Sequence, residues 1–142
     1  MQPLQPLPKC ELGESVVQLR DVTKSYPIVG RSDAVQALKG VCIGDGYPVG
    51  AIRKGEFIIL RGPSGGGKTT LLNLIGCIDT VTSGSIEMMG NQITASSSDE
   101  FLADLRLRSI GFVFQTFNLL GAFSAYVAFH TRASLRNANC MI

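Results

Sequence analysis

A glycine-rich stretch followed at once by Lys and Thr is the feature that most constrains this chain. Four of the six residues 62–67 are glycine, and residues 62–69 fit the pattern G-x-x-x-x-G-K-[ST]. Glycines allow backbone conformations closed to other residues, and they remove side chains that would keep an anion away. Consecutive N–H groups then form an anion-binding nest, and a following helix adds unpaired N–H groups. The pattern predicts a phosphate-binding loop.

The residues on either side of this loop favour the same interpretation. Residues 56–61 form a short apolar run between glycines, which predicts a strand buried on both faces. Apolar residues recur at helical spacing after the loop, which predicts a helix from Lys68 to Ile78. In such a loop Lys68 supplies a positive charge for the β- and γ-phosphates, and Thr69 supplies a hydroxyl for Mg²⁺.

Periodicity predicts further elements around this unit. Alternating apolar residues predict a strand over 16–22, and β-branched residues predict a second over 35–43. A helix is expected over 99–108, with Ser97 or Ser98 as its cap, acids in its first turn and Arg in its last. Two more short strands are expected at residues 85–89 and 110–114.

Composition narrows the class of protein. A net charge of +2 without a dense basic stripe gives no case for nucleic-acid binding. The longest apolar stretch, 119–129, is too short for a membrane helix, and the first residues lack the pattern of a secretory signal. Four cysteines without a C-x-x-C pair, beside a single His, argue against a metal site or a disulfide framework. We expect free thiols, with Cys42 and Cys77 as packing residues.

Several short segments, taken in order, carry a resemblance to a known family. The chain resembles the nucleotide-binding subunit of ABC transporters, of the lipoprotein-release and macrolide-export type, truncated after the Q-loop. The resemblance implies an α/β fold: the N-terminal part of a P-loop NTPase, with an antiparallel β subdomain and an incomplete parallel core sheet. It divides the chain into a flexible N-terminal segment (1–14), a partial nucleotide-binding domain (15–120) and a divergent tail (121–142). The segments that carry it are residues 19–26, 37–41, 53–57, 62–70, 71–79, 82–85 and 110–120.

The resemblance also assigns roles to residues. By position, Tyr26 matches the aromatic that stacks on adenine, and Gln115 matches the Q-loop glutamine that reaches Mg²⁺ or the attacking water. Lys68 and Gln115 are then the catalytic candidates, and Thr69 and Gln115 the Mg²⁺ ligands. Besides Tyr26, the residues expected to hold ATP are Gly62, Pro63, Ser64, Gly65, Gly66, Gly67, Lys68, Thr69 and Thr70.

The family's partners are implied in the same way. We expect a transmembrane permease subunit and a second nucleotide-binding domain as partners. The chain itself would lie at the cytoplasmic face of a membrane, attached through the permease, with no transmembrane segment of its own.

Three of the family's motifs are missing from these 142 residues: the Leu-Ser-Gly-Gly-Gln signature, the Walker B strand and the switch histidine. Asp79 offers a superficial Walker B aspartate, but it falls on the expected helix, and Thr80 stands where the catalytic Glu belongs. His130 lies too close to Gln115 to be the switch residue. We therefore expect ATP binding without hydrolysis by these residues alone, and an open hydrophobic sheet edge that makes the chain marginally stable and prone to associate.

Two other interpretations remain open. One is a different P-loop nucleotide kinase, although 61 residues precede the loop here and no Arg-rich lid segment is found. The other is a truncated product that is non-functional or regulatory.

Overall fold

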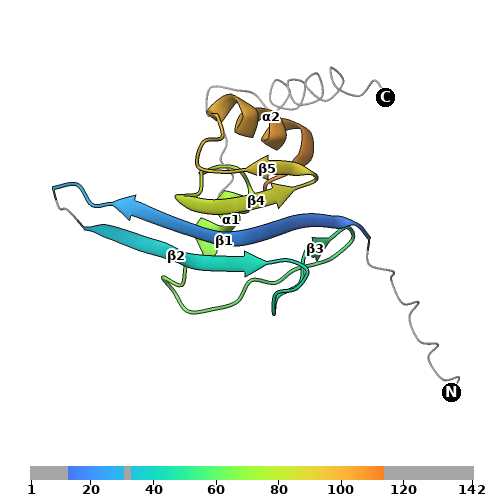
Figure 1. Cartoon of the computed structure of the whole chain (residues 1–142), viewed down its shortest axis with the longest axis horizontal. Coiled ribbons are helices and arrows are strands. Elements are labelled where there is room, and N and C mark those ends of the chain that lie inside the picture. The colour runs from blue at the N-terminus through green and yellow to red at the C-terminus, as the bar shows by residue number, and fades with distance from the viewer. Residues whose placement is uncertain (1–12, 31–32, 114–142) are drawn as a thin grey trace, which may run out of the picture.

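The computed structural model describes residues 13–30 and 33–113, which form a twisted antiparallel sheet with two helices (Figure 1). The strands lie side by side in the order β2-β1-β4-β5, and β3 also pairs with β1. All of these pairings are antiparallel. The elements are β1 (Ser15–Pro27), β2 (Ala34–Ile43), β3 (Ile52–Arg53), α1 (Lys68–Ile75), β4 (Ser83–Met88), β5 (Asn91–Ile93) and α2 (Asp99–Ser109).

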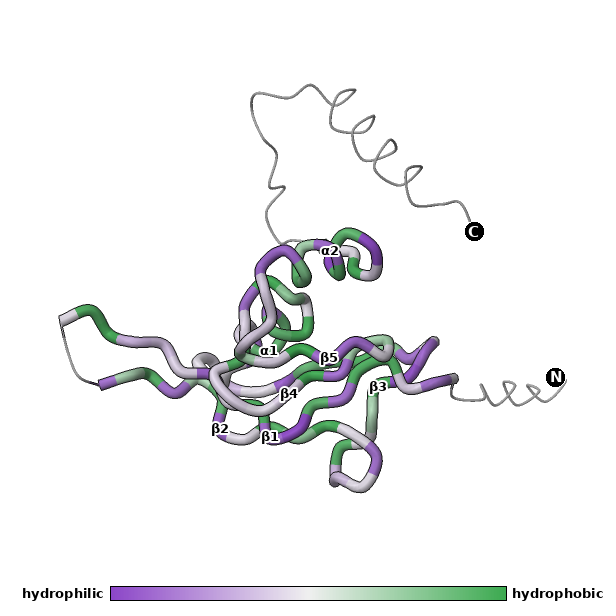
Figure 2. Tube along the Cα trace, turned by 45° about the horizontal axis from the view of Figure 1, so that its top comes forward, coloured by the Kyte–Doolittle hydropathy of each residue, from purple (hydrophilic) through white to green (hydrophobic). Residues whose placement is uncertain are grey.

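One hydrophobic core joins the sheet to both helices, which lie on the same side of it (Figure 2). Its fully buried side chains come from strands and helices alike and include Leu19, Leu74, Ile86, Ile93 and Leu102. Burying each such side chain contributes about 1.5–3 kcal/mol relative to leaving it exposed. The apolar face of α1 therefore fixes the helix, and the loop before it, against β1 and β2.

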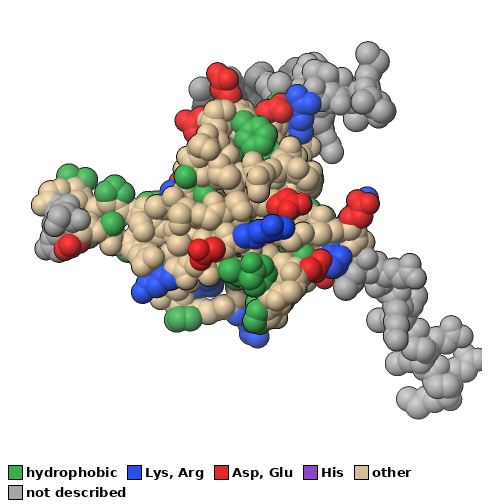
Figure 3. Space-filling model, viewed as in Figure 1, with side chains coloured by type: hydrophobic (Ala, Val, Ile, Leu, Met, Phe, Trp, Pro, Cys, Tyr) green, Lys and Arg blue, Asp and Glu red, His purple; other side chains and the backbone are tan. Residues whose placement is uncertain are grey.

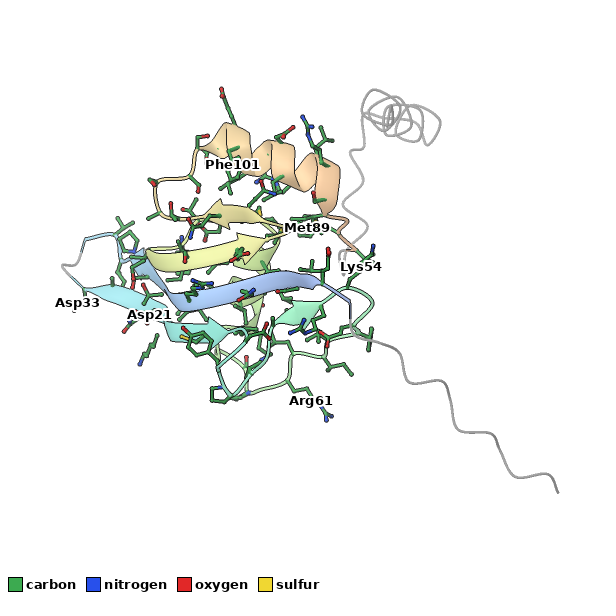
Figure 4. The ribbon with its side chains drawn as sticks, turned by 45° about the vertical axis from the view of Figure 1, so that its right-hand side comes forward. Asp21, Asp33, Lys54, Arg61, Met89 and Phe101 are labelled. Carbon is green, nitrogen blue, oxygen red and sulfur yellow. The ribbon has the colours of Figure 1, made fainter. Side chains whose placement is uncertain are left out.

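A bulge in β1 changes which side chains face this core. The register of β1 with β2 shifts between Leu19 and Val22, and Asp21 between them has a φ of 48°. Val17 and Leu19 are buried before the bulge, and Val22 and Lys24 after it, so the inward face skips one residue. Gly84 of β4 permits this, because a Cβ there would lie 2.2 Å from the carbonyl oxygen of Asp21. Figure 4 shows Asp21 on β1, between the neighbouring strands β2 and β4.

Several elements confirm the predictions from periodicity. The strand expected over 16–22 lies within β1, and the strand expected over 35–43 lies within β2. The strand expected over 85–89 overlaps β4. The helix expected over 99–108 is α2, and the Ser98 hydroxyl accepts a hydrogen bond from the Phe101 N–H at 3.3 Å. Antiparallel pairing of these strands agrees with the expected β subdomain.

The strand expected over residues 56–61 is wrong, since this segment has no strand pairing. Phe57 is 87% exposed and Ile59 68% exposed. A strand buried on both faces needs neighbouring strands at its edges and a layer of structure over each face. Among the described residues no strand pairs with this run, so its apolar side chains lie at the surface.

Two further expectations need correction at the end of α1. The helix ends at Ile75 rather than Ile78, because Cys77 adopts a left-handed φ of 55°. The strand expected over 110–114 does not form in the described part of that segment. Phe112 instead lies over Gly76, where a Cβ would stand 2.6 Å from its ring. The absence of a side chain at Gly76 lets the ring approach the end of the helix.

Candidate functional site

The glycine loop leads directly into α1 and lies against β2. Gly67 is the N-cap residue with a φ of 76°, and the helix begins at Lys68. A Cβ on Gly67 would lie 2.6 Å from the carbonyl oxygen of Ala37 and 2.8 Å from Cδ2 of Leu38. Only glycine fits this conformation and this approach, so Gly67 allows the loop to pack against the sheet. The first-turn N–H groups of α1 have no acceptor within the helix and open toward the loop.

Lys68 closes the loop from the helix side. Its Nζ donates to the carbonyl oxygens of Gly62 at 2.9 Å and Pro63 at 2.5 Å. The ammonium group thus lies against the first two residues of the loop. Arg61, just before the loop, points away from the sheet (Figure 4).

The donors gathered here fit a polyphosphate. The loop residues 62–66 are exposed, and the only charged side chain of residues 62–70 is the Lys68 ammonium. Helix N–H groups, an ammonium group and the hydroxyls of Thr69 and Thr70 are donors, as a phosphate chain requires. Thr69 is exposed, so its hydroxyl is accessible to a hydrated cation beside the phosphates.

The second part of the site is Tyr26, near the end of β1. It follows Val22 and Lys24 on the face set by the bulge, and 37% of its surface is exposed. The Thr70 side chain, in the first turn of the helix that follows the loop, lies near the Tyr26 hydroxyl. Beyond Tyr26 the β1–β2 hairpin carries exposed apolar side chains, including Val29 and Val35 (Figure 3). Tyr26 pairs with Val35 of β2, and Gly67 packs against Ala37 of the same strand, so Tyr26 and the loop adjoin neighbouring positions of β2.

An ion pair that the sequence did not reveal contacts Tyr26. Lys24 is only 8% exposed, and its Nζ donates to Oδ1 of Asp79 at 2.6 Å and to the Thr80 carbonyl oxygen at 2.7 Å. The Tyr26 hydroxyl donates to the other carboxylate oxygen, Oδ2, at 2.8 Å. The same ammonium lies 5.0 Å from the centroid of the Tyr26 ring, a cation–π contact.

These contacts shift two pKa values in opposite directions. Burial acts to raise the pKa of Asp79, but hydrogen bonds from Lys24, Tyr26 and the Thr80 N–H outweigh it, so the carboxyl pKa falls below its ordinary value. Burial and the hydrogen bond to Asp79 raise the pKa of the Tyr26 hydroxyl, and the neighbouring Thr70 side chain partly opposes this rise. Near neutral pH the carboxylate is charged, and Tyr26 keeps the proton that it donates.

Asp79 differs from its expected placement. It lies in the turn after α1 rather than on the helix, and its carboxylate is engaged by Lys24 and Tyr26. The sequence signal for this ion pair would be that Lys24 faces inward with the buried residues of β1. That alignment can be recognised only once the bulge at Asp21 is known. Gln115 lies outside the described residues, so its predicted role stays a prediction.

Other properties of the described residues concern thiols, metal ligands and membrane helices. Cys42 and Cys77 are free thiols, and burial raises the pKa of Cys77. Within residues 13–30 and 33–113 no cluster of three or more His, Cys, Asp or Glu side chains could hold a metal ion. In the same residues neither helix has the length and apolar character to cross a membrane.

Comparisons with known proteins show which family this chain is similar to. The sequence model of the family described as ABC transporter matches residues 50–138. ABC transporter H family member 2 of Dictyostelium discoideum is 46% identical over 112 residues, which span 79% of this chain and 20% of that protein. The macrolide export ATP-binding/permease protein MacB of Marinobacter nauticus is 40% identical over 111 residues, spanning 78% of this chain and 16% of MacB.

A solved structure supports the fold class. The ATP-binding cassette MJ0796, in a dimeric post-hydrolysis state bound to ADP and Pi, superposes with a TM-score of 0.65 at 39% identity. The match covers 76% of this chain and 42% of that cassette. The described residues are therefore similar to part of a cassette, and the matched region spans less than half of each of these relatives.

Proposed function

Because this chain belongs to the ABC transporter family, we propose that it binds Mg²⁺·ATP as the nucleotide-binding component of a transporter. The triphosphate would lie over residues 62–70, with the Lys68 ammonium beside the β- and γ-phosphates and the Thr69 hydroxyl on Mg²⁺. The adenine ring would stack on the exposed part of Tyr26. Bound Mg²⁺ would neutralise phosphate charge, which this chain meets with only one ammonium group of its own at the loop.

One observation carries this proposal: the loop passes directly into a helix, with the Lys68 ammonium on its carbonyl oxygens, and it packs against Ala37 of β2, two residues from the Val35 that pairs with Tyr26. A flexible glycine turn would not be fixed against β2, as Gly67 is. The donor groups and the aromatic ring thus occupy neighbouring positions, as a nucleoside triphosphate needs.

Partners and location belong to the same proposal. The relative from Marinobacter nauticus is named as an ATP-binding/permease protein, and MJ0796 was solved as a dimer. We infer a permease partner that carries the chain to the cytoplasmic face of a membrane, and a second nucleotide-binding domain. Gln115 would contribute to Mg²⁺ and to the attacking water.

Turnover by these 142 residues is expected to be negligible. Hydrolysis needs an oriented water as well as neutralised phosphate charge. The 142 residues include neither a Walker B Glu nor a signature segment. Binding, rather than phosphate release, is therefore the property to measure.

Calorimetric titration of the purified chain with Mg²⁺·ATP tests the proposal. Lys68→Ala removes the ammonium and should weaken ATP binding about 10- to 100-fold, since a hydrogen bond to a charged group contributes about 1.5–3 kcal/mol. Lys54→Ala is the matched control, because it removes an exposed lysine in the turn after β3, outside residues 62–70. Equal affinities for the wild type and Lys68→Ala, or no ATP binding by the wild type, would overturn the proposal.

A further inference from the structure

The two carboxylate oxygens of Asp79 accept hydrogen bonds from different partners. Oδ1 accepts from Nζ of Lys24 at 2.6 Å and from the Thr80 N–H at 2.7 Å. Oδ2 accepts from the Tyr26 hydroxyl at 2.8 Å. Three bonds on two oxygens hold the carboxylate in one orientation, so the hydroxyl that it accepts is held as well.

The charge pair is rigid because it is largely buried. The side chain of Lys24 is 11% exposed and that of Asp79 26% exposed. A buried ammonium group without a partner is strongly unfavourable, so Lys24 and Asp79 hold each other in place. The Thr80 carbonyl oxygen accepts a further bond from Lys24, which ties the pair to the turn after α1.

The hydroxyl held by Asp79 joins β1 to the end of α1. Tyr26 comes from β1, and Asp79 from the turn that follows α1. The other end of α1 begins at the glycine loop, and Gly67 of that loop packs against Ala37 of β2, the strand in which Val35 pairs with Tyr26. The position of the Tyr26 ring relative to the loop therefore depends on this hydroxyl.

We propose that Asp79 is a positioning residue of the nucleotide site: its carboxylate, paired with Lys24, holds the Tyr26 ring at the place where the adenine stacks. The inference rests on the proposed function and deepens it. Asp79 touches neither base nor phosphate, and it acts only through Tyr26. It therefore contributes to recognition of the nucleoside and not to recognition of the phosphates.

Comparing two ligands separates this role from a general structural one. Magnesium tripolyphosphate has the phosphate chain without a base, whereas Mg²⁺·ATP has both. In calorimetric titrations Asp79→Ala should weaken ATP binding about 3- to 10-fold and leave tripolyphosphate binding within about twofold, as expected for one lost hydrogen bond to a positioned ring. Asp45→Ala, which removes the exposed partner of Arg53, is the matched control and should change neither affinity.

Tyr26→Phe tests whether Asp79 acts through the Tyr26 hydroxyl. This variant keeps the ring but loses the hydroxyl, so it should weaken ATP binding about as much as Asp79→Ala. Adding Asp79→Ala to Tyr26→Phe should then cause no further loss, because both changes break one connection. Full additivity of the two losses would overturn the proposal.

Asp79→Ala leaves Lys24 buried without a partner, which destabilises the fold. A second variant without either charge is therefore used as well. Lys24→Met with Asp79→Leu removes both charges and retains apolar volume. This double variant should fold, by circular dichroism, and still show the selective loss for ATP. An unchanged ratio of ATP to tripolyphosphate affinity in it would overturn the role of Asp79 alone, provided that Lys68→Ala still weakens both ligands. A wild-type chain that binds neither ligand would overturn the proposed function, and this inference with it.

Discussion

Gly67→Ala tests how the phosphate loop is held against the sheet. At a φ of 76° any other residue is strained, by about 1–2 kcal/mol for a left-handed conformation. The added Cβ would also lie 2.6 Å from the Ala37 carbonyl oxygen and 2.8 Å from Leu38 Cδ2. Backbone oxygen cannot move aside cheaply, so overpacking adds about 1–3 kcal/mol. We expect a loss of about 2–5 kcal/mol in the free energy of unfolding.

Gly65→Ala is the matched control for this variant. Its φ is 78°, so the backbone strain is the same, but no atom lies within 4 Å of the added Cβ. The effect of an alanine on the unfolded chain is also common to both variants and cancels. The difference between them, about 1–3 kcal/mol, therefore measures the contact between the loop and β2.

Urea unfolding followed by far-ultraviolet circular dichroism provides the measurement, with equal m-values as the check that both variants unfold alike. Gly67→Ala should have the lower midpoint. If the two variants lose the same stability, β2 does not hold the loop, and the packing of Gly67 against Ala37 and Leu38 cannot be what positions the phosphate site.

Two further predictions concern the ion pair and the core. Folding lowers the pKa of Asp79, so the carboxylate's contribution to stability is complete above the unfolded value of about 3.9 and is lost as the pH falls through the lower folded value. Below pH 5 the urea midpoint of Asp79→Asn should therefore fall less with decreasing pH than that of the wild type. Parallel falls in the two midpoints would contradict this. Leu74 is fully buried on α1, so Leu74→Ala should lower the free energy of unfolding by about 2–5 kcal/mol in the same urea assay. Leu72 lies on the exposed side of that helix, so Leu72→Ala should lower it by less than about 0.5 kcal/mol. Similar losses for the two variants would contradict the orientation of α1.

Local chemistry made much of the fold predictable. Alternation predicted β1, β-branched residues predicted β2, and a serine cap at Ser97 or Ser98 with acids in the first turn predicted α2. These signals are local, because each strand or helix carries its own pattern. The strand over residues 56–61 was predicted wrongly because its apolar run depends on neighbouring strands, which a local pattern does not contain.

The site divides in the same way. The start of α1 at Lys68, directly after the glycine loop, was predictable because the loop and the helix are contiguous in sequence. The pairing of Lys24 with Asp79 joins residues 55 positions apart, and no spacing rule links them. Tyr26 was found only through resemblance, since a tyrosine near the end of a strand has no distinctive pattern of its own.

The bulge at Asp21 sets the phase of everything that follows it in β1. If the same residues alternated without interruption from Leu19, Thr23 and Ser25 would point inward where Lys24 and Tyr26 now do. Asp79 would then face no cation, and the aromatic ring would turn to the opposite side of the sheet. Because the bulge needs the space left by Gly84, a glycine on β4 without a side chain decides on which face of β1 Lys24 and Tyr26 lie.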